Sequence, residues 1–135
     1  MKHRGDIILT SEQAARICKF IQDNLRHFRF YPNINLKYRK EQDGRIVCFS
    51  PLTGRMSVLN PTMADIYTQL RNHPGLSIDQ IAEAIARKFN IEPEKIEGDI
   101  QSALIWLFSN GYINIKYKDK TMSFIQLVQE QVGGQ

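Results

Sequence analysis

The sequence predicts an α+β fold in which a three-stranded antiparallel sheet packs on three helices, with an extra amphipathic helix at the N-terminus. Three observations support this prediction. Residues 34–59 alternate as strands do and contain two turn signals, residues 60–110 contain three capped helix patterns, and residues 112–127 contain a second hairpin pattern. A strand that leads into three closely connected helices and then a hairpin is the element order of a winged helix-turn-helix domain.

The composition fits a single core. The chain has 135 residues, of which 42% are hydrophobic, and this length is enough to bury one core. No apolar run approaches the roughly 18 residues that a membrane-spanning helix needs, and the N-terminus lacks the long apolar core of a secretion signal. Cys18 and Cys48 are separated and form no CxxC motif, so two buried thiols are expected rather than a disulfide. We therefore expect a cytoplasmic protein that does not bind membranes.

An amphipathic helix is predicted near the N-terminus. Thr10 followed by Gln13 forms a capping-box pattern. The apolar positions then recur at helical spacing, at Ala14, Ile17, Cys18, Ile21, Leu25 and Phe28. This stripe predicts about four to five turns that dock on the chain's own core or on a partner. The helix belongs to an N-terminal extension, residues 1–31, which precedes a domain over residues 32–117 and a C-terminal element and tail over residues 118–135.

Three short strands are predicted next. Ile34, Leu36 and Tyr38 alternate with polar residues, as in a half-buried strand. The following segments are a hairpin turn at 42–44, a strand at 45–50, a turn at 51–54 and a strand at 55–59. Because this last strand ends the meander, it can lie at a sheet edge with open N–H and C=O groups.

Capping signals delimit three further helices. The first begins at Asn60 and Pro61, the second at the Ser77–Gln80 capping box, and the third runs from Pro93 to Asn110, where Gly111 stops it. The third helix has an apolar face and, nearly opposite, a stripe of small residues around one aliphatic residue. The stripe consists of Gly98, Gln101, Ser102 and Ile105. Either the N-terminal helix packs on this stripe, or the stripe forms one wall of a groove for a bound peptide.

The C-terminal segment is open to two interpretations. Residues 112–117 and 121–127 form a hairpin pattern that predicts a wing, whereas residues 123–131 could equally form a short helix. Residues 132–135 are expected to be a disordered tail.

The sequence lacks the motifs of catalysis and of metal binding. It contains no phosphate-binding glycine loop, no GxSxG and no HExxH. His3, His27 and His73 lie in different elements and, with two separated cysteines, give no zinc-binding spacing. We therefore expect no catalytic residue, no metal and no cofactor, and conclude that the chain is not an enzyme.

The charge is unevenly distributed. Residues 1–60 carry 11 Lys and Arg against 5 Asp and Glu, a net +6, and residues 61–135 carry 7 against 9, a net −2. A helix-turn-helix that grips DNA needs cationic side chains on its recognition helix. Here that helix opens with Glu92, Glu94, Glu97 and Asp99 against Lys95 alone, so no nucleic acid partner is expected.

Residues 36–113 resemble the PqqD-like family of peptide-binding proteins. The resemblance is carried by the strand–turn–strand IVCFSPLTGRMSVLN, the helix opening LNPTMADIY, the helix IDQIAEAIARKF and the segment IEGDIQSAL, with Asn110-Gly111 near its end. In this family the leader segment of a precursor peptide lies as a fourth strand along the third strand and against the third helix. The resemblance therefore implies a peptide-binding site formed by Arg55, Met56, Ser57, Val58, Leu59, Gly98, Gln101, Ser102 and Ile105.

The resemblance also implies a function. Such a protein holds the leader of a ribosomally made precursor peptide and presents it, as a peptide chaperone in natural product biosynthesis, to a separate modifying enzyme, often a radical SAM enzyme. Two alternatives stay open: a scaffold or assembly subunit that binds a protein partner, and a winged-helix DNA-binding regulator. The oligomeric state is not predicted.

Overall fold

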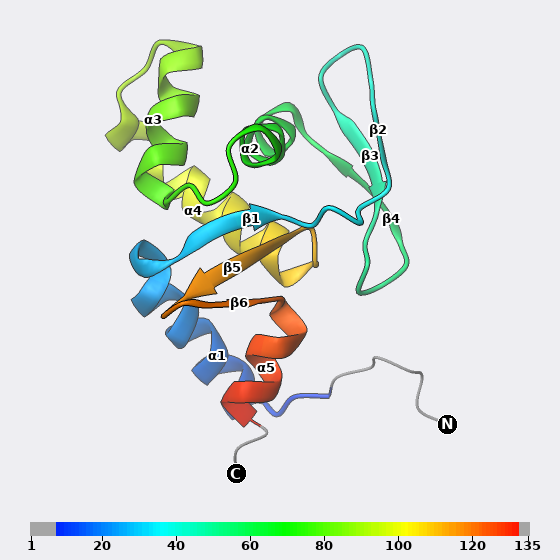
Figure 1. Cartoon of the computed structure of the whole chain (residues 1–135), viewed down its shortest axis with the longest axis vertical. Helices are drawn as coiled ribbons and strands as arrows, with labels where there is room; N and C mark the ends of the chain where they lie inside the picture. Colours follow the sequence, from blue (N-terminus) through cyan, green and yellow to red (C-terminus); the bar gives the residue numbers. More distant parts are fainter. Residues whose placement is uncertain (1–7, 133–135) are drawn as a thin grey trace.

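The computed structural model describes residues 8–132 and shows an α+β chain (Figure 1). Within these residues there are two three-stranded antiparallel sheets and five α-helices. In chain order, the elements are α1 (Ser11–Asn24), the 3-10 helix η1 (Leu25–His27), β1 (Arg29–Pro32), β2 (Tyr38–Lys40), β3 (Ile46–Phe49), β4 (Met56–Leu59), α2 (Pro61–Asn72), α3 (Ile78–Phe89), α4 (Pro93–Ser109), β5 (Ile113–Tyr117), β6 (Lys120–Met122) and α5 (Phe124–Val132). The α+β class is thus confirmed, the expectation of one sheet is corrected to two, and the winged-helix assignment stays a prediction.

The first sheet has the order β1-β5-β6. Strand β1 was not predicted, because the apolar stripe of the N-terminal helix was extended to Phe28, whereas α1 ends at Asn24 and η1 follows it. Phe30 pairs with Ile115, 85 positions later in the chain, and a local pattern contains no information about so distant a partner. Because β1 spans the boundary expected between residues 31 and 32, the N-terminal extension and the following region share one sheet.

The second sheet has the order β2-β3-β4, with β3 in the centre and β4 at an edge. Ile46 pairs with Leu59 and Phe49 with Met56. Strand β2 begins at Tyr38 and not at Ile34, whose side chain is 76% exposed. The reason is a turn around Asn33, whose backbone C=O accepts a hydrogen bond from the N–H of Leu36 and whose side chain accepts one from that of Asn35.

The predicted helix caps are confirmed. Thr10 and Gln13 form a reciprocal capping box at α1, as do Ser77 and Gln80 at α3. The Asn60 side chain accepts a hydrogen bond from the N–H of Met63 and so caps α2, with a donor–acceptor distance of 2.9 Å. These local signals fix where the helices begin, and therefore where β4 passes into α2.

The α2 helix is central in the molecule, because it contacts α3, β1 and β4 (Figure 1). Its Ile66, Tyr67 and Leu70 are fully buried. The N-terminal helix joins the same core, to which it contributes Ile17 and Ile21. Burial of these side chains makes α1 part of the folded unit.

The C-terminal segment contains both predicted elements, the hairpin with a shorter second strand and the helix at its predicted length. A tight turn at Lys118 and Asp119, both with positive φ, joins β5 to β6. Strand β6 ends at Met122, and Ser123 and Gln126 exchange capping hydrogen bonds at the start of α5. The segment predicted as a tail lies outside the described residues except for Val132, the last residue of α5. Over residues 8–132, no helix is both long and apolar enough to cross a membrane.

Candidate peptide-binding site

Strand β4 has one edge that no other strand of the described chain occupies. In an antiparallel ladder, the backbone groups of successive residues point alternately toward the partner strand and away from it. The N–H of Ser50 donates to the C=O of Arg55 at 2.9 Å. This hydrogen bond shows which residues of β4 point toward β3 and which point away from it. Ser57 and Leu59 therefore bond to β3, whereas the N–H and C=O groups of Met56 and Val58 point to the open edge.

The side chains of β4 alternate between the two faces of the sheet. Leu59 is buried and Ser57 is half-buried, so these two side chains face the core. Met56 and Val58 lie on the outer face and are 63% and 53% exposed. A chain added along this edge would continue the alternation and direct every second side chain toward the helices.

A hollow lies where β4 passes into α2. Its volume is about 460 Å³. It is lined by Asn60, Thr62, Met63, Asp99, Ser102, Ala103 and Trp106. The α4 residues among these are spaced at i, i+3, i+4 and i+7, so they occupy one face of the helix. The hollow therefore runs between the start of α2 and the middle of α4, immediately beyond the last residue of β4.

A second hollow of about 290 Å³ adjoins the first, since Thr62 and Asp99 line both. Its remaining lining is apolar and consists of Ile85, Phe89, Ile91, Ile96 and Ile100. Phe89 and Ile91 are 48% and 42% exposed. We call the two hollows together the α2–α4 groove. Near β4 the lining is mixed, because Met63, Ala103 and Trp106 lie among its polar side chains, and at the far end it is apolar.

Hydrogen bonds fix β4 relative to α4. Ser50, in the turn before β4, donates its hydroxyl to the C=O of Asn110 at the end of α4, at 2.9 Å. The same hydroxyl oxygen accepts from the N–H groups of Leu52 and Thr53. Gly111 has a φ of +83°, and a Cβ there would lie 3.0 Å from Leu52. The β3–β4 hairpin is thus held against the C-terminus of α4.

Tyr112 is buried between β4 and α4. Its ring centroid is 5.5 Å from that of Trp106 on α4. Burial raises the pKa of its phenol, and Ser57 of β4 and Cys48 of β3 are among the neighbours that act on this pKa. Burial likewise raises the pKa of the Cys48 thiol. Both groups are therefore neutral at physiological pH, and the inner face of β4 next to the groove carries no charge from them.

The predicted stripe on α4 faces in a different direction. Gln101, Ser102 and Ile105 line a hollow of about 460 Å³ together with η1 and the end of α1. Arg26 of η1 also forms ion pairs with Glu97 and Asp79 beside it. Ser102 alone of these lining residues also reaches the α2–α4 groove. Gly98 is exposed, and a Cβ at this position would have no neighbour within 4 Å.

The β4 edge was therefore predicted from the sequence, but most of the groove was not. The groove residues that were not predicted are Asn60, Thr62, Met63, Asp99, Ala103 and Trp106 in the first hollow and Ile85, Phe89, Ile91, Ile96 and Ile100 in the second. Their α4 members form a stripe displaced by one position from the predicted one. The signal that could have found it is Trp106, the single tryptophan of the chain, which is only partly buried.

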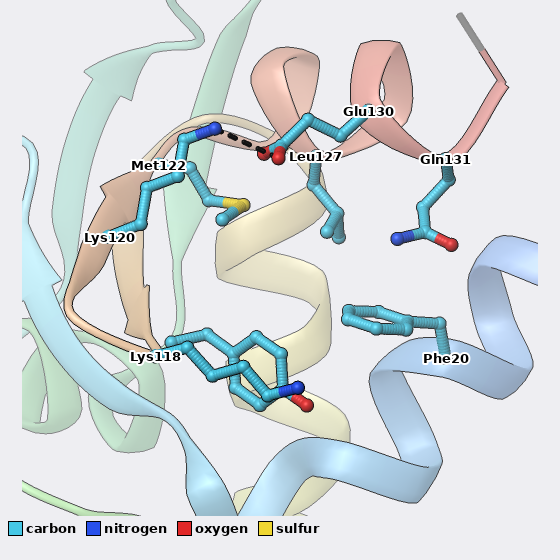
Figure 2. A pocket seen from close by; sticks show the side chains of 8 residues that line it. Phe20, Lys118, Lys120, Met122, Leu127, Glu130 and Gln131 are labelled. Atoms are coloured by element: carbon cyan, nitrogen blue, oxygen red, sulfur yellow. Dashed lines mark ion pairs between the residues drawn. The ribbon is translucent and has the colours of Figure 1, made fainter. Parts of the chain in front are cut away.

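Another hollow lies away from the β4 edge, between α1, the β5–β6 hairpin and α5 (Figure 2). Its volume is about 230 Å³. Phe20, Met122 and Leu127 point into it, and Lys120 and Glu130 form an ion pair of 2.8 Å at its margin. Within residues 8–132, no three His, Cys, Asp or Glu side chains gather in a cluster that could hold a metal ion.

An open strand edge beside a groove can accept an extended peptide. The model of the family described as coenzyme PQQ synthesis protein D (PqqD) matches residues 45–113, which are 69 of the 135 residues. The chain belongs to the PqqD family. The match includes β3, β4, all of α2 to α4 and the first residue of β5.

A solved structure, described as TbiB1 in complex with the TbiA(beta) leader peptide, is similar to the chain at 18% sequence identity and a TM-score of 0.48. The similarity covers 57% of this chain and 86% of that one. No curated protein matches the chain.

Proposed function

We propose that this chain is a non-catalytic binding protein that recognises the leader segment of a ribosomally made precursor peptide and presents it to a separate modifying enzyme. The observation that carries the proposal is the open edge of β4 directly beside the α2–α4 groove. Membership of the PqqD family supports it. Such a protein would act in the cytoplasm, and a radical SAM enzyme is one candidate for the partner.

The leader binds by strand addition. Its backbone exchanges hydrogen bonds with the N–H and C=O groups of Met56 and Val58, which accounts for affinity without selecting a sequence. Sequence selection comes from the leader side chains that point inward, because these pass Ser57 and enter the groove beside Trp106. An apolar leader side chain can be buried at the far end of the groove, against Phe89 and Ile91.

The charge of the sheet favours an acidic leader. Arg39 and Arg45 are paired with Glu41 and Asp43. Lys37, Lys40 and Arg55 form no ion pair within residues 8–132. Such solvent-exposed cations raise the association rate of an acidic peptide more than they raise its final affinity.

The test is a pair of substitutions at one position. Val58→Pro removes an N–H that points to the open edge, whereas Val58→Ala keeps it. Since one hydrogen bond is worth about 1 kcal/mol and proline also obstructs the added strand, Val58→Pro should weaken leader binding by about tenfold or more. Val58→Ala should bind within about threefold of the wild type.

Binding is measured by NMR titration of the labelled protein with the N-terminal segment of a small peptide encoded beside it. Saturable shifts should be confined to residues 55–59 and to the groove, and the Trp106 fluorescence should change with the same midpoint. Circular dichroism of Val58→Pro controls for unfolding. Equal affinities of the two Val58 variants, with both folded, would contradict strand addition at β4.

A further inference from the structure

One carboxylate of the α2–α4 groove has no ionic partner in the described chain. Asp99 lines both hollows of the groove, and within residues 8–132 it forms no ion pair, not even with Lys95 one turn before it on α4. By contrast, Asp65 of α2 is paired with Lys88 of α3 at 2.6 Å. No lysine, arginine or histidine lines either hollow. The groove therefore contains a negative charge that no cation of the described chain contacts.

An aromatic side chain lines the same hollow near β4. Trp106 follows Asp99 by seven positions, so the two residues lie on one face of α4, about 10 Å apart along the helix axis. The indole packs on the Tyr112 ring at a centroid distance of 5.5 Å, but Tyr112 does not line the hollow. The part of the indole that lines the hollow is thus turned away from Tyr112. Between the two residues the helix presents Ala103, a buried alanine whose small side chain leaves the space open.

A carboxylate and an aromatic ring that line one hollow suit a cationic side chain. An ammonium or guanidinium group is attracted both by a carboxylate and by an indole ring, and the stem of a lysine or arginine can lie on an apolar floor. The span fits, because a cation lies within about 4 Å of a paired carboxylate oxygen and within about 6 Å of a ring centroid. An apolar side chain would leave Asp99 without a partner, and a carboxylate would be repelled by it.

The order of the two hollows gives the position of this cation along a bound chain. The first hollow begins directly after β4, and the apolar hollow lies beyond Thr62 and Asp99, which line both. A chain that leaves the β4 edge and follows the groove therefore passes Asp99 before it reaches Phe89 and Ile91.

We infer that Asp99 selects a lysine or arginine of the leader, which lies between the segment paired with β4 and an apolar residue buried at the far end of the groove. The inference rests on the proposed function, because the groove is the proposed leader site, and it adds a specificity-determining residue to that site. It is compatible with a leader that is acidic elsewhere, since Lys37, Lys40 and Arg55 belong to the sheet and do not line the groove.

The first test replaces each Lys and Arg of the leader segment by Gln, one at a time, and titrates each peptide into the full-length wild type and Asp99→Asn. One replacement should weaken binding to the wild type by about tenfold. The same replacement should cost Asp99→Asn less than about threefold, because the charge pair is already lost there. A leader that binds without any Lys or Arg, or replacements that all cost both proteins equally, would overturn the inference.

The matched control is Glu94→Gln, which removes a carboxylate from the same helix. Glu94 is exposed, forms no ion pair within residues 8–132 and lines neither hollow. The net charge therefore changes as in Asp99→Asn, whereas the groove does not. Asp99→Asn should weaken binding of the unchanged leader by about fivefold, and Glu94→Gln by less than about twofold. Equal losses would mean that Asp99 acts through the net charge alone and would refute its role in selection.

A small probe separates this inference from the proposed function. N-acetyl-arginyl-phenylalanine amide and its glutamine analogue are each titrated into the labelled full-length protein. The arginine probe should shift Asp99, Ala103 and Trp106 saturably and bind at least about threefold more tightly than the glutamine probe, and Asp99→Asn should abolish this difference.

The combined results identify which proposal fails. If the leader does not bind but the arginine probe binds as expected, the proposed function fails and the cation site stands. If the leader binds but Asp99→Asn changes neither its affinity nor the preference between the two probes, the cation site fails and the proposed function stands. If neither the leader nor the arginine probe binds, both fail.

Discussion

Tyr112 is the residue at which the β4 edge and the groove meet. Its side chain is fully buried and its ring lies against Trp106, yet its hydroxyl has no hydrogen-bond partner among the described residues. A buried hydroxyl without a partner costs free energy that a phenyl ring does not. The hydroxyl of Tyr112 therefore lowers the free energy of unfolding, although the residue keeps its position between Ser57, Cys48 and Trp106.

Burial of Tyr112 predicts a stability loss in alkali. The pKa values of the Tyr112 and Tyr67 phenols are raised by burial above their ordinary value of 10.0, and that of the Cys48 thiol above 9.0. Above these ordinary values the unfolded chain releases protons that the folded chain still holds. The free energy of unfolding should thus be highest below about pH 9 and fall as the pH rises through the folded-state pKa values.

Tyr112→Phe isolates one of these groups. We expect its free energy of unfolding at neutral pH to equal that of the wild type or to exceed it by up to about 1 kcal/mol, and to fall less in alkali. Urea denaturation at neutral pH and above pH 10 measures both. Tyr38→Phe, which removes a solvent-exposed phenol, is the matched control. A large loss of stability in Tyr112→Phe at neutral pH would show that its hydroxyl has a partner after all.

At the scale of elements, α1 packs on the first sheet through aromatic contacts. The Phe20 ring meets the Tyr117 ring edge-on at 5.6 Å and lies 6.4 Å from that of Phe28. The Tyr117 hydroxyl donates to the side-chain oxygen of Asn24 at 3.0 Å. Since Ile17 and Ile21 are buried beside these contacts, α1 stabilises the sheet that contains β5.

Phe20→Ala tests this packing. Because the ring is partly buried, we expect a loss of about 1–3 kcal/mol in the free energy of unfolding. The control is Lys19→Ala, which removes only a solvent-exposed ion pair with Asp23 and should cost less than about 0.5 kcal/mol. Urea denaturation gives both values. Equal stabilities of the two variants would mean that α1 does not pack on the first sheet in solution. Its apolar side would then be free to bind a partner protein.

The elements also show what local sequence patterns can and cannot predict. The caps at Thr10, Asn60 and Ser77 were predictable, because each depends on residues within four positions, and so was the β3–β4 hairpin. Strand β1 was not, because its partner is β5. The groove face of α4 was missed for a related reason: Asp99 and Trp106 become a wall only when α2 is placed beside them, and sequence periodicity does not show which helix face meets which neighbour.

At the scale of the whole molecule, the basic half of the sequence contains the β4 edge, whereas almost all of the α2–α4 groove lies in the other half. Residues 1–60, which contain all of the β2-β3-β4 sheet, carry the net +6, whereas residues 61–135 carry −2. An acidic leader would therefore be attracted to the sheet before any hydrogen bond forms. The walls of the groove add the opposite sign at Asp99, which disfavours an acidic side chain deep in the groove.

This distribution predicts that salt acts on the rate of leader association. Raising the ionic strength from about 0.05 M to about 0.5 M shortens the Debye length and should slow association by about tenfold. The dissociation rate should change by less than about twofold, because the strand-addition hydrogen bonds and the groove contacts lie at short range.

Stopped-flow fluorescence of Trp106, the single tryptophan, can measure both rates without a label. A leader whose carboxylates are replaced by amides is the control and should associate at a rate independent of salt. If that neutral leader shows the same salt dependence as the acidic one, the attraction does not come from the leader's charge.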